Sequence, residues 1–259
     1  MDGSRCGLLL VAGALAVGCA PESVTTTDEA PIRGGVLDAE DRAVVFVEME
    51  GGHSCSGSLV AKNVVLTATH CVNGARPTAV WVGPGPFNAE GRAGAPTGSR
   101  HAIRELLQFP GVTIGNDGVV VDGSFDAALL RLDDDVADIP PLTLALDRPK
   151  VDEECRAVGF GLHDGETHET AAHAKRSASV LVTGFSQSGI DTLRMTGSAD
   201  RGDSGGPLLC GERIAGVAWR LLPAASGGWR TDALRYVRVE GPVAEWVETT
   251  IGRWEDATR

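Results

Sequence analysis

The chain has 259 residues, of which 42% are hydrophobic and 22% are charged, so it is long enough to bury a sizeable core. Its formal net charge of −12 argues against nucleic-acid binding, because phosphates would be repelled. The 34 glycines and 13 prolines are typical of a protein rich in loops.

The N-terminus has the pattern of an export signal. Residues 8–17 are apolar but too few to span a bilayer. The following letters, LAVGC at 15–19, resemble a bacterial lipoprotein box, in which Cys19 becomes the lipidated first residue. We therefore expect a signal peptide over residues 1–18 and a membrane contact only through a lipid anchor at Cys19. Cleavage after Ala20 is the alternative, and either route implies export.

Residues 19–31 form a separate segment, which after Cys19 is polar and lacks apolar periodicity. This composition predicts a flexible tether or a propeptide.

From residue 32 onward, short apolar runs alternate with glycine, proline or polar breaks, which indicates β-strands. The expected strands include Ala43–Val47, Gly57–Val60, Val64–Thr67, Val80–Val82, Val119–Val121, Ala127–Leu132, Ala157–Phe160, Val180–Val182, Pro207–Leu209, Ile214–Trp219 and Tyr236–Val239.

Two segments depart from the strand pattern. Residues 83–100 are rich in glycine and proline and predict a surface loop. Near the C-terminus, Val243, Val247 and Thr250 recur at helical spacing and predict a closing helix. Many strands and one C-terminal helix indicate an all-β architecture.

Three short motifs carry reactive side chains. The letters RGDSGGP at 201–207 place Ser204 between glycines, which allow a tight turn and a close approach to a substrate. A serine hydroxyl alone is a poor nucleophile and needs a base with an orienting acid. The letters TATHC at 67–71 supply His70, and FDAALLRL at 125–132 supplies Asp126.

These motifs, in the order histidine, aspartate, serine, resemble the trypsin/chymotrypsin family of serine proteases. The resemblance covers residues 32–259 and implies two six-stranded antiparallel β-barrels with the active site between them. It implies His70 as general base, Asp126 as its orienting acid and Ser204 as nucleophile. The amides of Gly202 and Ser204 would form the oxyanion hole. No cofactor is implied.

The cysteine count fits an exported protein. Four cysteines remain after the signal region: Cys55, Cys71, Cys155 and Cys210. An even set predicts two disulfides, with three possible pairings, and buried free thiols are the alternative. The family resemblance selects Cys55–Cys71 and Cys155–Cys210. No metal site is expected, because no Cys-x-x-Cys or His-x-x-x-His spacing occurs.

Asp203 has a different implied role. In the family, the acid before the nucleophile pairs with a newly cut N-terminal ammonium, and the letters IRGG at 32–35 resemble that N-terminus. Pro31 departs from the usual lysine or arginine, so we hypothesise that another protease cleaves before Ile32. The alternative is that Ile32 is only a strand residue.

The resemblance places a specificity pocket at four residues: Ser198 at the floor, Trp219 and Arg220 at the wall, and Leu234 at the entrance. The floor carries no acid, which disfavours cleavage after lysine or arginine. Leu234, or Arg235 if the register shifts by one, replaces a common glycine. A leucine there favours small or medium apolar side chains, whereas an arginine in the pocket favours acidic ones.

The leading interpretation is an exported, monomeric serine endopeptidase that acts on protein or peptide substrates. The alternative is a catalytically silent homologue that binds proteins. An α/β-hydrolase is rejected although GDSGG at 202–206 fits Gly-x-Ser-x-Gly, because the serine comes last and helical alternation is missing.

Overall fold

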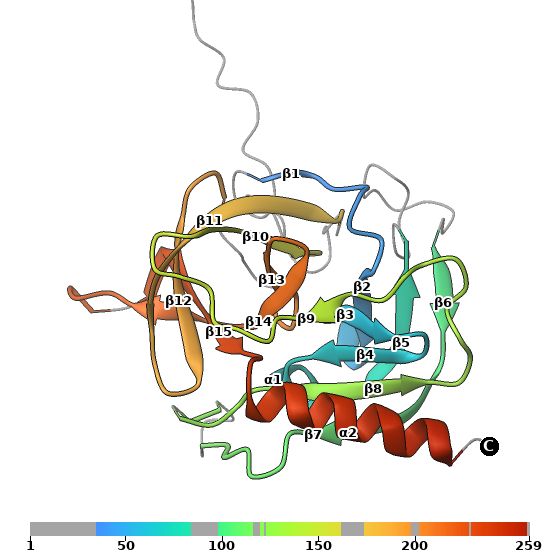
Figure 1. The fold of residues 1–259 in the computed structure, drawn as a ribbon. Helices are drawn as coiled ribbons and strands as arrows, with labels where there is room; N and C mark the ends of the chain where they lie inside the picture. Colours follow the sequence, from blue (N-terminus) through green and yellow to red (C-terminus); the bar gives the residue numbers. More distant parts are fainter. Residues whose placement is uncertain are drawn as a thin grey trace, which may run out of the picture.

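The structure is a computed structural model that describes residues 35–83, 98–115, 120–121, 123–161, 174–197, 202–227 and 229–257. Two curled β-sheets lie side by side, and one long helix near the C-terminus packs outside them (Figure 1). Among these residues, none of the helices has the length and apolar character needed to cross a membrane.

The first sheet is antiparallel and has seven strands. They are β2 (Val44–Met49), β3 (Ser54–Ala61), β4 (Val64–Thr67), β5 (Pro77–Val82), β6 (Ser99–His101), β7 (Ile103–Gln108) and β8 (Ala128–Leu132). Their order is β6-β5-β2-β3-β4-β8-β7. Only Ala102 separates β6 from β7, so the two ends of this order form one bent strand. The sheet therefore curls on itself as a barrel.

The second sheet contains a closed ring. Its strands are β1 (Val36–Leu37), β9 (Thr143–Leu144), β10 (Glu154–Gly159), β11 (Arg176–Phe185), β12 (Gly189–Arg194), β13 (Pro207–Cys210), β14 (Arg213–Pro223) and β15 (Trp229–Arg238). The order β11-β10-β13-β14-β15-β12 closes because β11 also pairs with β12, which makes a barrel of six strands. β1 extends it beside β11, and β9 adds a short parallel pair with β14.

The burial of the strands explains their sequences. β4 and β8 are buried along their whole length, so they are apolar in the sequence except for the buried Thr67 and Arg131. In β11, buried residues alternate with more exposed ones, because one face lines the barrel interior and the other faces outward. The barrels meet where Phe46 of β2 packs edge-on against Phe160, with ring centroids 5.7 Å apart.

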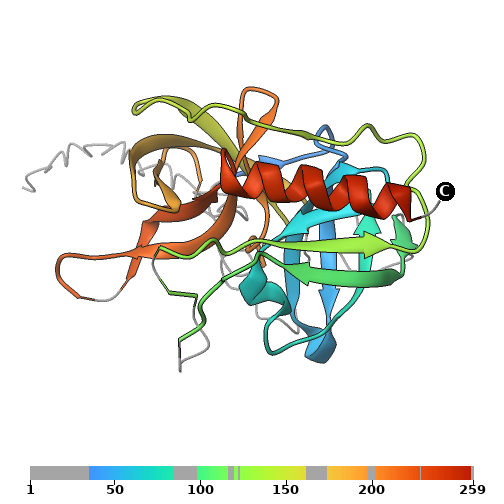
Figure 2. The ribbon, with the colours of Figure 1, turned by 60° about the horizontal axis from the view of Figure 1, so that its bottom comes forward.

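Within the described ranges, two short helices and one long helix accompany the sheets: η1 (Glu50–Gly52), α1 (Thr69–Val72) and α2 (Pro242–Asp256). α2 begins with a proline at a position where the missing N–H costs nothing. Val243, Val247, Thr250 and Trp254 form its buried face. The helix lies along the outside of the first barrel, beside β8 (Figure 2).

The all-β fold with a C-terminal helix is confirmed, but two local predictions were wrong. Ser99 and Arg100, predicted within a loop, belong to β6; residues 84–97 of that loop lie outside the described residues. Of the run Val119–Val121, Val119 lies outside the described residues, Val120 forms a single bridge with Ile114, and Val121 is exposed.

Candidate active site

His70 lies in α1, which begins directly after β4. Cys71 is disulfide-bonded to Cys55 of β3, so the short helix is tied to the sheet. Thr69 Oγ1 donates to Ala127 O at 2.7 Å, and this bond ties the same helix to the start of β8. α1 therefore has a fixed position relative to both neighbouring strands.

Asp126 comes just before β8, which pairs with β4 through the register Thr67–Ala128. This pairing brings the aspartate beside His70, although 56 residues separate them in the chain. The His70 backbone N–H donates to Oδ1 at 2.9 Å, and its ring Nδ1 lies 2.6 Å from Oδ2. The structure therefore joins the two predicted residues through two contacts.

The electrostatic setting of this pair is asymmetric. Asp126 has no exposed surface, whereas the His70 side chain is 26% exposed. A buried carboxylate that accepts two hydrogen bonds keeps its charge at a tolerable cost, and it favours the tautomer with a proton on Nδ1. Nε2 is then the ring nitrogen that carries no proton and can act as the base.

Ser204 lies in the loop before β13 and is half-buried. Its carbonyl accepts from Ser56 N at 2.8 Å. A Cβ at Gly205 would overlap Thr67 Oγ1 and lie 3.0 Å from Ala68 N, so this loop packs against the end of β4, just before His70. Among the described residues, the Ser204 hydroxyl has no hydrogen bond to the His70 ring, whose Nε2 lies 3.9 Å from Cys71 Sγ.

Gly202 is buried with φ at +97°, in the region that favours glycine. Within the part of the chain that the structure describes, neither Gly202 N–H nor Ser204 N–H has a hydrogen-bond acceptor. An oxyanion hole requires two backbone N–H groups that are available to donate hydrogen bonds.

Asp203 points away from its neighbours into the protein and is 3% exposed. Gly161 N donates to its Oδ1 at 2.8 Å, and a Cβ at Gly159 or Gly161 would overlap the carboxylate. Burial raises the pKa of the nearby Tyr236 phenol, and the Asp203 charge raises it further. Ile32, the predicted partner of Asp203, lies outside the described residues.

The structure describes three of the four predicted pocket residues, Trp219, Arg220 and Leu234. Leu234 is 8% exposed and packs in the interior of the second barrel, whereas Trp219 packs in the core that joins the barrels. The Arg220 guanidinium lies over the Trp219 ring, 4.4 Å from its centroid. Arg235 forms a bidentate pair with Asp191, at 2.6 and 2.9 Å. Ser198 lies outside the described residues, as does Cys19.

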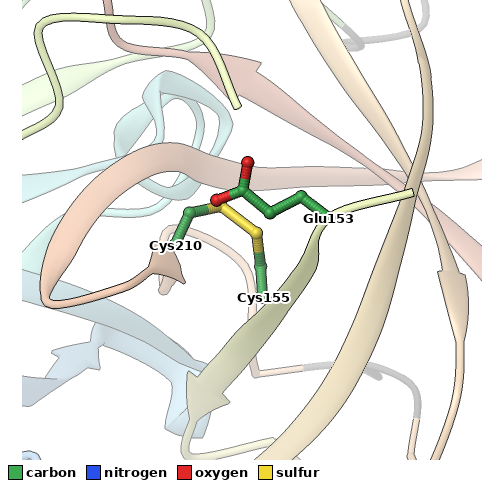
Figure 3. Close-up of side chains that lie close together, drawn as sticks. All are labelled: Glu153, Cys155 and Cys210. Atoms are coloured by element: carbon green, nitrogen blue, oxygen red, sulfur yellow. A yellow bond between two sulfur atoms is a disulfide. The ribbon is translucent and has the colours of Figure 1, made fainter. Parts of the chain in front are cut away.

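The second disulfide joins Cys155 of β10 to Cys210 of β13, so both predicted pairings are present. The Glu153 carboxylate lies beside these sulfurs, within 4.8 Å (Figure 3). Because the two sulfurs are bonded to each other, Glu153 supplies the group's single free ligand. This cluster is therefore not suited to hold a metal ion.

Three buried hydroxyls at the site were not predicted: Ser56, Thr67 and Thr69. Thr67 Oγ1 donates to Ser56 O at 2.9 Å, beside the Ser204 loop. Thr69 Oγ1 donates to the carbonyl of Ala127, the residue after Asp126. The sequence offers a signal only for Thr67, which ends an otherwise apolar strand.

Comparison with known proteins identifies the family. The family model described as Trypsin matches residues 33–239. Trypsin II-P29 of Gallus gallus is 25% identical over 252 residues, covering 88% of this chain and 92% of the relative. Neutrophil elastase of Mus musculus is 24% identical over 217 residues, covering 81% of this chain and 78% of the relative.

A solved structure supports the fold. Neuropsin, a serine protease expressed in the limbic system of mouse brain, superposes with a TM-score of 0.64 at 19% identity. The match covers 84% of this chain and 98% of neuropsin. With the family model matching most of the chain, the conclusion is that this chain belongs to the trypsin family of serine proteases.

Proposed function

We propose that this chain is an exported serine endopeptidase that hydrolyses peptide bonds through an acyl-enzyme intermediate. The observation that carries the proposal is the contact between His70 and the fully buried Asp126, at 2.6 and 2.9 Å. An imidazole oriented in this way by a buried carboxylate is the base that a serine nucleophile needs.

In the proposed reaction, Nε2 of His70 takes the Ser204 hydroxyl proton while Oγ attacks the scissile carbonyl carbon. The carbonyl π electrons move to its oxygen, which becomes the oxyanion of a tetrahedral intermediate. Asp126 stays ionised and stabilises the imidazolium that forms. The Gly202 and Ser204 amides donate to the oxyanion, and each donor contributes about 3 kcal/mol.

The intermediate collapses when the C–N bond breaks and the imidazolium gives its proton to the leaving amine. The product is an ester between Ser204 and the acyl half of the substrate. Water then repeats the sequence with His70 again as base, which releases a carboxylic acid and restores the hydroxyl. The cycle uses the three side chains, the two backbone amides and water.

The proposed activation step is cleavage before Ile32. The new ammonium would pair with Asp203, which is buried directly beside the nucleophile. Pro31 indicates that the activating protease does not cut after a basic residue. N-terminal sequencing of active enzyme should begin at Ile32, and active enzyme that begins at Cys19 would contradict this step.

The proposed substrate preference is a small or medium apolar residue before the scissile bond. Leu234 takes up space inside the second barrel, and Arg235 is neutralised by Asp191. Neither favours a long or acidic side chain. In a peptide library, cuts after arginine would overturn this preference.

Export is the proposed location, with a signal peptide over residues 1–18. The two disulfides support it, because such bonds persist in oxidising compartments. Lipidation at Cys19 would anchor the domain through residues 20–31, and the domain itself would act as a monomer.

The test of hydrolysis uses an unstructured protein such as casein with purified enzyme and Ser204→Ala. We expect fragments from the wild type and none from the variant. A wild type that leaves casein intact, after treatment that exposes Ile32, would favour the silent binding homologue instead.

A further inference from the structure

Ser56, in the middle of β3, has no exposed surface and connects three segments. Its Oγ donates to Gly202 O at 2.8 Å and accepts from Phe160 N at 2.9 Å. Its backbone N–H donates to Ser204 O at 2.8 Å. One residue of the first barrel thus holds the nucleophile loop at two points and the end of β10 at a third.

Each of the three consecutive carbonyls of this loop accepts a hydrogen bond, two from β3 and one from within the loop. Ser56 holds those of Gly202 and Ser204, and Asp203 O accepts from Gly206 N at 2.9 Å. A trans peptide points its N–H opposite to its C=O. The Asp203 carbonyl therefore directs Ser204 N–H to the other side of the loop.

Gly202 is the residue that most needs such an anchor. At a φ of +97° it occupies a region that glycine enters and leaves freely. A hydrogen bond to its carbonyl restricts rotation of the adjoining peptide. The Ser56 hydroxyl supplies that bond from a buried strand, which is a rigid base for a catalytic loop.

The Ser56 side chain is closely packed by its neighbours. A Cβ at Gly159 would lie 3.1 Å from Ser56 Oγ, and a Cβ at Gly206 would lie 3.1 Å from Ser56 Cβ. Both glycines therefore leave room for this side chain. With its proton donated and a lone pair occupied, the hydroxyl has a single favourable orientation.

We propose that Ser56 is a positioning residue for the oxyanion hole. It holds the peptide between Gly202 and Asp203, and this fixes the loop so that the Gly202 and Ser204 amides converge on one oxygen. The inference rests on the proposed hydrolytic function. The amides bind the oxyanion more strongly than the substrate carbonyl, so Ser56 acts mainly on the transition state.

The test compares wild type, Ser56→Ala and the matched control Ser58→Ala, which removes another buried hydroxyl from β3. With a peptide amide substrate, Ser56→Ala should lower kcat about 30-fold and change KM less than about twofold. The pH profile should keep its wild-type midpoint, because the His70–Asp126 pair is untouched. Inhibition by a peptide aldehyde, which forms a tetrahedral adduct, should weaken in step with kcat.

The outcomes separate the two claims. Ser56→Ala with kcat within twofold of wild type, or with a loss equal to that of Ser58→Ala, overturns the role of Ser56 and leaves the protease proposal standing. A wild type that cannot hydrolyse any peptide overturns both. If Ser56→Ala does not fold, Ser56→Gly, which removes the same hydroxyl, should show the same fall in kcat.

Discussion

At the scale of single residues, Asp126 has no solvent-exposed surface and contacts both the backbone and the ring of His70. Asp126→Asn keeps the size but removes the charge and favours the wrong imidazole tautomer. We expect kcat for a peptide amide to fall about 10⁴-fold at neutral pH. The control Asp133→Asn removes an exposed carboxylate and should change kcat less than twofold. An Asp126→Asn enzyme with a tenth of wild-type kcat would contradict the role.

Gly205 is the second residue with a sharp consequence. Its φ is +80°, and a Cβ would overlap Thr67 Oγ1 and Ser56 O. Gly205→Ala should therefore cost about 3 kcal/mol or more in urea unfolding, from backbone strain and overpacking together. Gly211→Ala shares the positive φ but meets nothing within 4 Å, so about 1 kcal/mol is expected. Equal costs would show that the close approach at Gly205 is relieved easily.

The sequence singles out site residues where their neighbours in the chain define a motif. His70 and Asp126 stand in such motifs, and the structure joins them. Ser56 and Thr69 were missed because their partners, Gly202 and Ala127, lie 146 and 58 residues away. A hydroxyl in a strand gives no sign of which distant carbonyl it meets.

At the scale of elements, α2 is fixed at its C-terminal end by Arg131 of β8. The guanidinium donates to Trp254 O at 2.8 Å and lies 5.5 Å from the centroid of the Trp254 ring. A cation near the last carbonyls of a helix also offsets the negative end of its dipole.

Arg131→Met keeps the side-chain stem and removes the charge. We expect a loss of about 2 kcal/mol in unfolding and faster amide hydrogen exchange in the last turn of α2. The control Arg104→Met, which removes an exposed arginine from the neighbouring strand β7, should cost less than about 0.5 kcal/mol. Unchanged exchange in Arg131→Met would mean that apolar packing alone fixes this end.

Elements were predictable where burial shapes the sequence. β4 and β8, buried along their whole length, were found as apolar runs. β7 was missed because its residues, Ile-Arg-Glu-Leu-Leu-Gln, are mostly half-buried and charged in part. In β11, the apolar run predicted only Val180–Val182 of a ten-residue strand. The rest of the strand is held by backbone hydrogen bonds to β10 and β12, which leave no apolar pattern in the sequence.

At the scale of the whole molecule, a cluster of charged side chains joins the two barrels. Arg156 of β10 forms a bidentate ion pair with Asp41, which lies just before β2. The second contact, between Nη2 and Oδ1, is 3.1 Å long. Lys175, just before β11, donates to Asp41 O at 2.7 Å and is 6% exposed. Burial lowers the pKa of Lys175, although the charges of Asp38 and Asp41 oppose this.

This cluster predicts a pH dependence of stability. The unfolded state binds a proton at Lys175 up to about pH 10.5, whereas the folded state releases it earlier, so wild-type stability rises with pH across that window. Lys175→Met lacks this gain. Its stability relative to wild type should therefore decrease between pH 7 and pH 10.5, measured by urea unfolding at each pH.

Tyr236 does not disturb this comparison. Burial raises its pKa, which lowers folded-state stability above pH 10, but the effect is common to both proteins. A stability difference that stays constant with pH would show that Lys175 keeps its proton as readily in the folded state as in the unfolded chain.

The overall architecture was predictable because three motifs identify the family, and the family carries the fold. The proposed roles of Ser198 and Ile32 stay predictions, because both residues lie outside the part of the chain that the structure describes. The barrel interface depends on pairs such as Phe46 with Phe160, which no local pattern specifies.

The most direct measurement is covalent labelling by a fluorophosphonate, followed by peptide mapping of the modified protein. The reagent forms a bond to an activated serine oxygen with loss of fluoride, so it reports the nucleophile and its base together. We predict one label per molecule, at Ser204, and no label in Ser204→Ala or in urea-unfolded protein. Labelling at another serine, or none in the folded wild type after cleavage before Ile32, would contradict the account.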